Sequence, residues 1–177
     1  MTDLQDVHAQ LHAINQAAAF NRWCGLEVKS ASAGQVELVL PWRAEFGQYS
    51  GFLHAGLIGA LIDTACGFAA VTVAGSGVLA AHFSMNCLRP AQGEHFIARA
   101  RVVRAGKTQV FTACELFAVF AQEEKLVATG ETLLSVATLV MASSMVAEQA
   151  EGPGAVPVEQ LAVLVGEWEV KGQWKDG

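Results

Sequence analysis

The feature that most constrains this chain is a long, almost uncharged segment in its first half. Residues 46–88 carry one formally charged side chain, Asp63, within the stretch LHAGLIGALIDTACGFAA. Burying a lone ionised carboxylate is costly unless its charge is compensated. The segment therefore predicts a buried element that retains one acid for a specific purpose.

One long helix is predicted over residues 54–73, between the polar stretch GQYSG and the turn GSG. On a helical wheel the positions nearest Asp63 are all small, namely Gly56, Gly59, Ala60, Cys66, Gly67 and Ala70. Glycine inside a helix costs about 1 kcal/mol relative to alanine. We therefore expect another backbone or a thin ligand to approach this face. Packing of Asp63 against neighbouring strands is the alternative.

The order of elements indicates an α+β fold. An amphipathic helix is predicted over residues 3–20 and a strand over 35–42, ahead of the long helix. Strands then follow at 78–88, 95–103, 109–120 and 126–137, with turns at 104–107 and 122–125. Consecutive hairpins exclude a doubly wound parallel sheet. We expect an antiparallel sheet wrapped around one long central helix.

The chain divides into three parts on this basis. Residues 1–20 form the N-terminal helix, 21–138 the main domain, and 139–177 a C-terminal extension. The extension has a Gly/Pro linker at 151–157 and a possible short helix after it.

Composition favours a cytoplasmic, self-associating protein. Of the 177 residues 53% are hydrophobic and 16% charged, against about 25% charged in average chains. The uncharged run 132–147 is shorter than the roughly 20 residues that cross a bilayer. The N-terminus lacks the basic region of a secretory signal. We expect the excess apolar surface to be hidden between subunits.

Metal, cofactor and nucleic-acid functions are not indicated. Four cysteines, Cys24, Cys66, Cys87 and Cys114, form no CxxC or Cys/His cluster, which argues against zinc and favours buried thiols. The net charge of −6 argues against nucleic acid as a partner. We expect neither a metal nor a separate cofactor.

The central segment resembles a known family. LHAGLIGALID is similar to the signature of hotdog-fold acyl-CoA thioesterases, specifically the phenylacetate-degradation type of the 4-hydroxybenzoyl-CoA thioesterase superfamily. That group carries His-Gly-Gly at the helix start and an acid nine positions after the His, as His54 and Asp63 are spaced here. NCLRPAQGE at 86–94 and VVRAGKT at 102–108 resemble two further elements. The resemblance covers roughly residues 20–138 and implies the hotdog fold.

The resemblance implies hydrolysis of small or medium aryl- or acyl-CoA thioesters, with coenzyme A as part of the substrate. Asp63 is then the general base or the nucleophile, and the backbone N–H of Ala55 or Gly56 stabilises the oxyanion. Gln48 orients the carbonyl, or else bonds its own loop. His54 mainly opens the helix beside the substrate. The residues assigned to coenzyme A are Arg89, Arg104, Gly106 and Lys107.

The resemblance also implies homodimers or homotetramers with active sites between chains. Two departures from the family pattern stand out: Ala55 replaces the first glycine, and Ala80 and Ala81 replace a water-holding Ser or Thr, leaving Ser84 as the nearest hydroxyl. Two alternatives remain. One is a non-catalytic acyl-CoA-binding protein, and the other a hotdog dehydratase or hydratase that uses His54 or His82.

Overall fold

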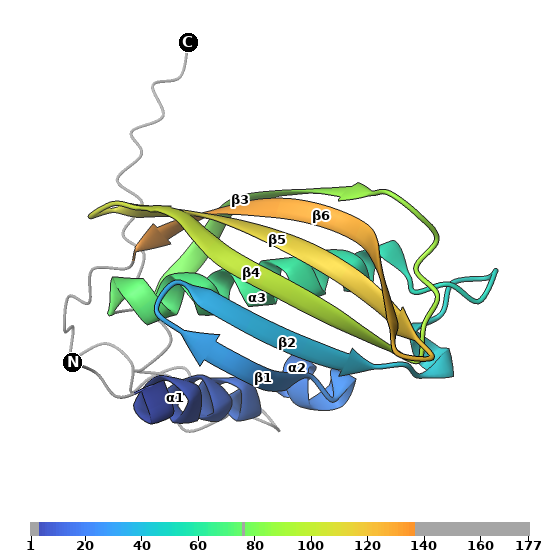
Figure 1. Ribbon diagram of the computed structural model, residues 1–177. Coiled ribbons are helices and arrows are strands. Elements are labelled where there is room, and N and C mark those ends of the chain that lie inside the picture. Colours follow the sequence, from blue (N-terminus) through green and yellow to red (C-terminus); the bar gives the residue numbers. More distant parts are fainter. Residues whose placement is uncertain (1–3, 76, 137–177) are drawn as a thin grey trace, which may run out of the picture.

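A six-stranded antiparallel sheet curves around one long helix in the computed structural model, which describes residues 4–75 and 77–136 (Figure 1). The strand order is β1-β2-β4-β5-β6-β3. The strands are β1 Glu27–Ser32, β2 Gln35–Pro41, β3 Val78–Cys87, β4 His95–Ala105, β5 Gln109–Phe120 and β6 Glu123–Val136. The predicted α+β hotdog architecture is confirmed. The predicted C-terminal extension, 139–177, lies outside the described residues.

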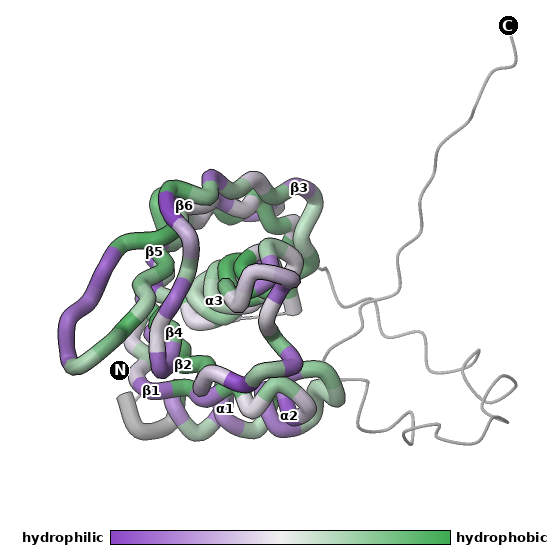
Figure 2. The backbone as a smooth tube through the Cα atoms, turned by 90° about the vertical axis from the view of Figure 1, so that its right-hand side faces the viewer, coloured by the Kyte–Doolittle hydropathy of each residue, from purple (hydrophilic) through white to green (hydrophobic). Residues whose placement is uncertain are grey.

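The central helix α3 spans Ala55–Ala74 and begins directly after His54, whose Nδ1 accepts a hydrogen bond from the Gly56 N–H. It ends at Gly75, which has a left-handed backbone with φ of 64°. Figure 2 shows α3 enclosed by the curved sheet, with α1 and α2 beside the β1 end of that sheet. Its buried residues are Ile58, Gly59, Leu61, Ile62, Ala65, Cys66, Phe68, Ala69 and Ala70.

The inner face of the sheet supplies the rest of the core. On β2, Val36, Leu38 and Leu40 are buried while the residues between them are more exposed, as the two-residue period of a strand requires. On β4, Ala98 and Ala100 are buried among the same core residues. α3 is long and apolar enough to cross a membrane, but half of that stretch is buried inside the domain, as in the core helix of a globular fold.

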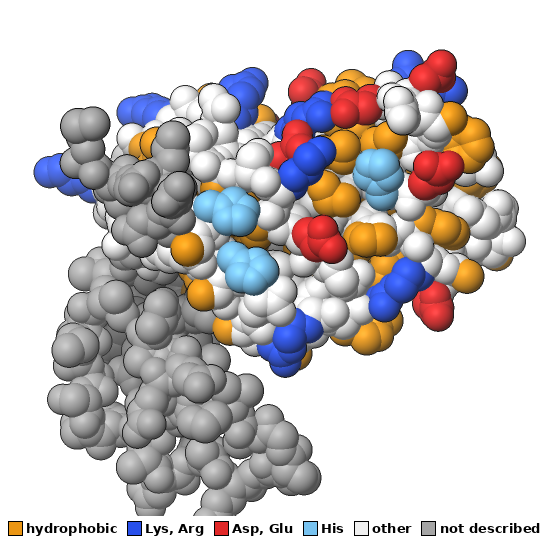
Figure 3. All heavy atoms as spheres, turned by 60° about the horizontal axis from the view of Figure 1, so that its bottom comes forward, with side chains coloured by type: hydrophobic (Ala, Val, Ile, Leu, Met, Phe, Trp, Pro, Cys, Tyr) orange, Lys and Arg blue, Asp and Glu red, His pale blue; other side chains and the backbone are white. Residues whose placement is uncertain are grey.

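The N-terminal helical region differs from the single helix predicted over residues 3–20. It consists of α1, Leu4–Ala17, and a separate short helix α2, Ala19–Cys24. Two buried amides fix α2: Asn21 donates to the Asn15 side chain at 3.0 Å, and Asn15 donates to the Leu26 carbonyl at 2.6 Å. Figure 3 shows hydrophobic side chains among charged ones on this side of the molecule.

Two other predictions need correction. The turn predicted at 122–125 is instead centred on Ala121 and Gln122, whose φ values of 47° and 69° make a tight hairpin, so Glu123 already begins β6. Of the four cysteines predicted to be buried, Cys87 is exposed because it ends β3, an outer strand of the sheet. The neighbouring Cys66 thiol, together with burial, holds the pKa of Cys114 well above its ordinary value.

Position 130 on β6 requires glycine, because β6 packs closely against α3 on one side and pairs with β3 on the other. A Cβ at this position would lie 2.7 Å from Ile62 Cγ2 and 2.7 Å from the Ser84 carbonyl oxygen. Gly130→Ala is therefore expected to destabilise the fold by about 3 kcal/mol, at the upper end of overpacking effects. Gly59→Ala is the control, because its Cβ would meet Met85 Sδ at 3.5 Å, an ordinary contact. Equal melting temperatures for the two variants would contradict this account.

Candidate active site

Asp63 lies on α3, half-buried, and one of its oxygens has no partner. Oδ1 is shielded from solvent and accepts no hydrogen bond from the described residues. Burial raises the pKa of Asp63 above its ordinary value. No described cation forms an ion pair with it; the ion pairs of the described chain involve Lys29, Arg99 and two glutamates. A desolvated carboxylate with a free oxygen is suited to accept a proton or attack a carbonyl.

The start of α3 presents one unoccupied donor. The Gly56 N–H is 2.9 Å from His54 Nδ1 and is therefore already engaged. The Ala55 N–H has no acceptor among the described residues. Ala55 is not among the residues with positive φ, so alanine fits where the family pattern has glycine. Of the two donors expected from the sequence, Ala55 is the one available to a ligand.

The side chains of Gln48 and Ser84 each contact a polar group of the same chain rather than pointing toward Asp63. The Ser50 N–H donates to Gln48 Oε1, so within one chain the Gln48 amide bonds its own loop. Phe83 on β3 lies against Gly59 of α3, and Ser84, the next residue, faces the opposite side of the strand. There its Oγ lies 3.4 Å from a carboxylate oxygen of Glu131. Ser84 therefore does not replace the water-holding hydroxyl of the family pattern.

The residues assigned to coenzyme A separate into two groups at opposite ends of the sheet. Arg89 lies near the helix start, where the Leu53 N–H donates to the Ala91 carbonyl, and its own Nη1 donates to Leu126 O at 2.6 Å. Arg104 and Lys107 lie at the β4–β5 turn, at the other end of β4 (Figure 1). Eleven residues of strand span roughly 35 Å. One chain therefore does not gather all of these groups around one ligand.

Asp63 and the free donor are also well separated within a chain. Asp63 is eight residues after Ala55 on the helix, which corresponds to about 12 Å along the axis. A reacting carbonyl needs both groups within roughly 3 Å. A single chain therefore does not bring the Asp63 carboxylate and the Ala55 N–H to the same reacting carbonyl.

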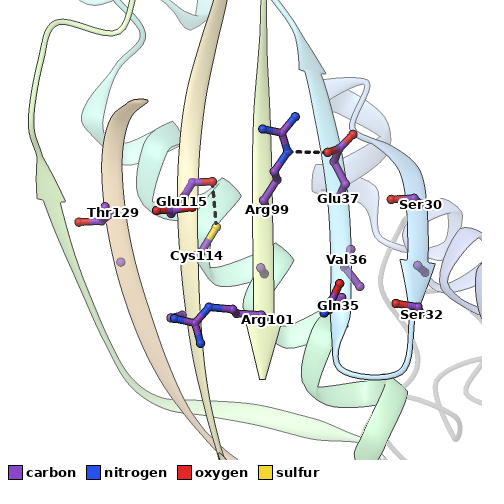
Figure 4. Close-up of a pocket in the computed structure, with 14 residues that line it drawn as sticks. Ser30, Ser32, Gln35, Val36, Glu37, Arg99, Arg101, Cys114, Glu115 and Thr129 are labelled. Carbon is purple, nitrogen blue, oxygen red and sulfur yellow. Dashed lines mark hydrogen bonds and ion pairs between the residues drawn. The ribbon is translucent and has the colours of Figure 1, made fainter. Parts of the chain in front are cut away.

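A hollow on the outer face of the sheet is separate from Asp63. This cavity of about 590 Å³ runs across β1, β2, β4, β5 and β6, and many of the side chains that line it are polar (Figure 4). Within it Arg99 Nε lies 2.7 Å from a carboxylate oxygen of Glu37. The sheet separates this hollow from α3, because residues that alternate with its lining pack on the helix.

Comparison with known proteins agrees with the fold. The sequence model of the Thioesterase superfamily matches residues 50–123, which contain all of α3. A Halobacterium salinarum protein provisionally named as an esterase is 31% identical over 113 residues, covering 60% of this chain and 74% of that protein. Acyl-coenzyme A thioesterase 13 of Homo sapiens is 29% identical over 115 residues, covering 63% of this chain and 82% of that protein.

Solved structures show the same architecture. A thioesterase family protein from Silicibacter pomeroyi is 31% identical with a TM-score of 0.70, covering 73% of this chain and 96% of that one. The PaaI protein of E. coli, at 22% identity and a TM-score of 0.70, covers 77% and 97% and shows the fold alone. The wrapped helix with its single acid defines a hotdog domain of the thioesterase class. The chain belongs to the thioesterase superfamily.

Proposed function

We propose that this protein hydrolyses small or medium aryl- or acyl-CoA thioesters, as a member of the phenylacetate-degradation type of the superfamily. The observation that carries the proposal is the unpartnered, half-buried carboxylate of Asp63 in an otherwise neutral helix. The likeness to acyl-coenzyme A thioesterase 13 supports a CoA thioester as the substrate.

The chemistry follows from the two groups left free. The Asp63 carboxylate removes a proton from water, whose oxygen attacks the thioester carbonyl, or it attacks that carbon itself and forms an anhydride that water then hydrolyses. The C–S bond breaks in either route, and the products are the free acid and coenzyme A. The Ala55 N–H, at the positive end of the helix dipole, stabilises the oxyanion.

We infer that the complete site forms between two copies of the chain. The separation of about 12 Å between Ala55 and Asp63 requires the helix start of a partner. β3 is suited to bring the partner close, because it is an outer strand with exposed apolar side chains such as Leu79 and Phe83. The Arg104–Lys107 turn of one chain and Arg89 of the other then supply cations for the phosphates of coenzyme A.

The test is thiol release across a panel of CoA esters, including acetyl-, hexanoyl-, decanoyl- and phenylacetyl-CoA. We expect hydrolysis of at least one short or medium ester, measured as free coenzyme A. Tight binding of every ester with no release of thiol would identify a non-catalytic acyl-CoA-binding protein instead.

A further inference from the structure

An apolar patch lies on the outer face of the sheet, near the end of β6. Phe111 of β5 is 44% exposed, and it points away from α3 because its neighbours Val110 and Thr112 are buried. Val103 lies where β4 bulges beside Phe111 and is 57% exposed. Leu133 of β6 pairs directly with Phe111 and is half-buried. These three residues, Val103, Phe111 and Leu133, form the outer patch, whose apolar surface is stabilised when it is covered.

The C-terminal extension starts beside the outer patch. β6 ends at Val136, whose N–H donates to the carbonyl of Thr108 in the β4–β5 turn at 2.9 Å (Figure 1). Leu133 precedes Val136 by three residues, so the end of the strand is about 10 Å from the patch. Residues 137–177 continue the chain from this point. Every segment of the extension is therefore tethered next to the patch.

One segment of the extension has the composition that would cover this surface. The sequence VEQLAVLVGEWEV, residues 158–170, contains the uninterrupted apolar run 161–165 and then Trp168. A tether of about 20 residues keeps such a segment at an effective concentration in the millimolar range. A second copy of the chain would have to reach a similar concentration to compete. The segment of the same chain is therefore the favoured occupant.

The charges of the two surfaces are opposite in sign. Arg101 and Arg104 lie on β4 beside the patch, are exposed, and form no ion pair with any residue that the structure describes. Glu131 of β6, which is opposite Ala113, offsets part of their charge. Residues 158–170 contain three glutamates and no basic residue. Arg104 is also assigned to coenzyme A above, which leaves Arg101 as the cation available to these glutamates.

We propose that residues 158–170 dock on the outer patch of their own chain, with the apolar run and Trp168 against Val103 and Phe111 and the glutamates toward Arg101. The extension then adds a layer on the face of the sheet opposite α3. This docking is independent of the proposed thioesterase activity, because Asp63 and Ala55 both belong to α3.

The experiment measures amide hydrogen exchange of the full-length chain by mass spectrometry. In the wild type the amides of 158–170 are expected to be protected, to the same degree after a tenfold dilution. Phe111→Asp is expected to speed their exchange by about 10–100-fold, the loss that corresponds to one apolar side chain left uncovered. Arg101→Glu is expected to speed it by about two- to fivefold, the range for one exposed ion pair.

Phe120→Asp is the matched control, because Phe120 is also an exposed phenylalanine of β5, at the opposite end of the strand. Its exchange in 158–170 is expected to equal that of the wild type. Unprotected amides in wild-type 158–170, or protection that neither Phe111→Asp nor Arg101→Glu reduces, would overturn the docking. If Phe111→Asp also exposes the amides of the sheet, Arg101→Glu alone decides. Protection that is lost on dilution would identify a second copy as the occupant and overturn the proposal as well.

Discussion

Asp63→Asn is expected to lower kcat by about 10²–10⁴, the contribution of a general acid or base. The amide keeps the shape of the side chain but neither removes a proton from water nor attacks the thioester. KM for the CoA ester is expected to change little, because Asp63 acts on the reacting carbonyl rather than on coenzyme A. Steady-state kinetics with the best ester of the panel provide the measurement. Glu115→Gln, on the outer face of the sheet, is the control for loss of one negative charge.

The same substitution is expected to stabilise the fold. Burial raises the pKa of Asp63, so the native state binds this proton more tightly than the unfolded chain does. Ionised Asp63 therefore destabilises the native state at neutral pH, and the penalty is relieved as the pH falls through its folded pKa. Asp63→Asn is expected to add about 0.5–2 kcal/mol at neutral pH and nothing at low pH. Wild-type turnover, or a lower melting temperature at neutral pH, would contradict the role assigned to Asp63.

Ala55→Pro is expected to lower kcat by about 10²–10³, the usual effect of losing one oxyanion donor. Proline removes only the N–H, because Ala55 is the first residue of α3, where proline is favoured. His54 has φ of −62° and ψ of 135°, the extended conformation that a residue before proline requires. Ala55→Gly keeps the N–H and is expected to retain wild-type kcat. A fully active Ala55→Pro variant would exclude this donor.

Mixing the two inactive variants tests whether the site lies between chains. A heterodimer of Asp63→Asn and Ala55→Pro chains contains one site with both groups intact and one site with neither. Random pairing makes half the dimers mixed, so about a quarter of wild-type activity is expected to return. No recovery after the subunits have exchanged would show that both groups serve a site within a single chain.

The sequence was informative about the site residues that depend on local geometry. The acid nine residues after His54, the helix boundaries and the capping role of His54 all follow from spacing along one helix, and the structure contains the helix where it was predicted. Which donor is free was not readable, because the choice depends on the His54 rotamer that engages Gly56.

The amino-acid sequence by itself determined the central helix with its single acid and the antiparallel hairpins that follow it, but not the separate helix α2 or the strand β1. These features depend on periodicity and turn residues, which act between close neighbours in the chain. Only the tertiary structure decided that Asp63 has an unpartnered oxygen and that the Ser84 side chain faces away from the central helix. Those properties depend on contacts between residues far apart in sequence, where a change of strand face or helix position alters the partners without altering the local pattern.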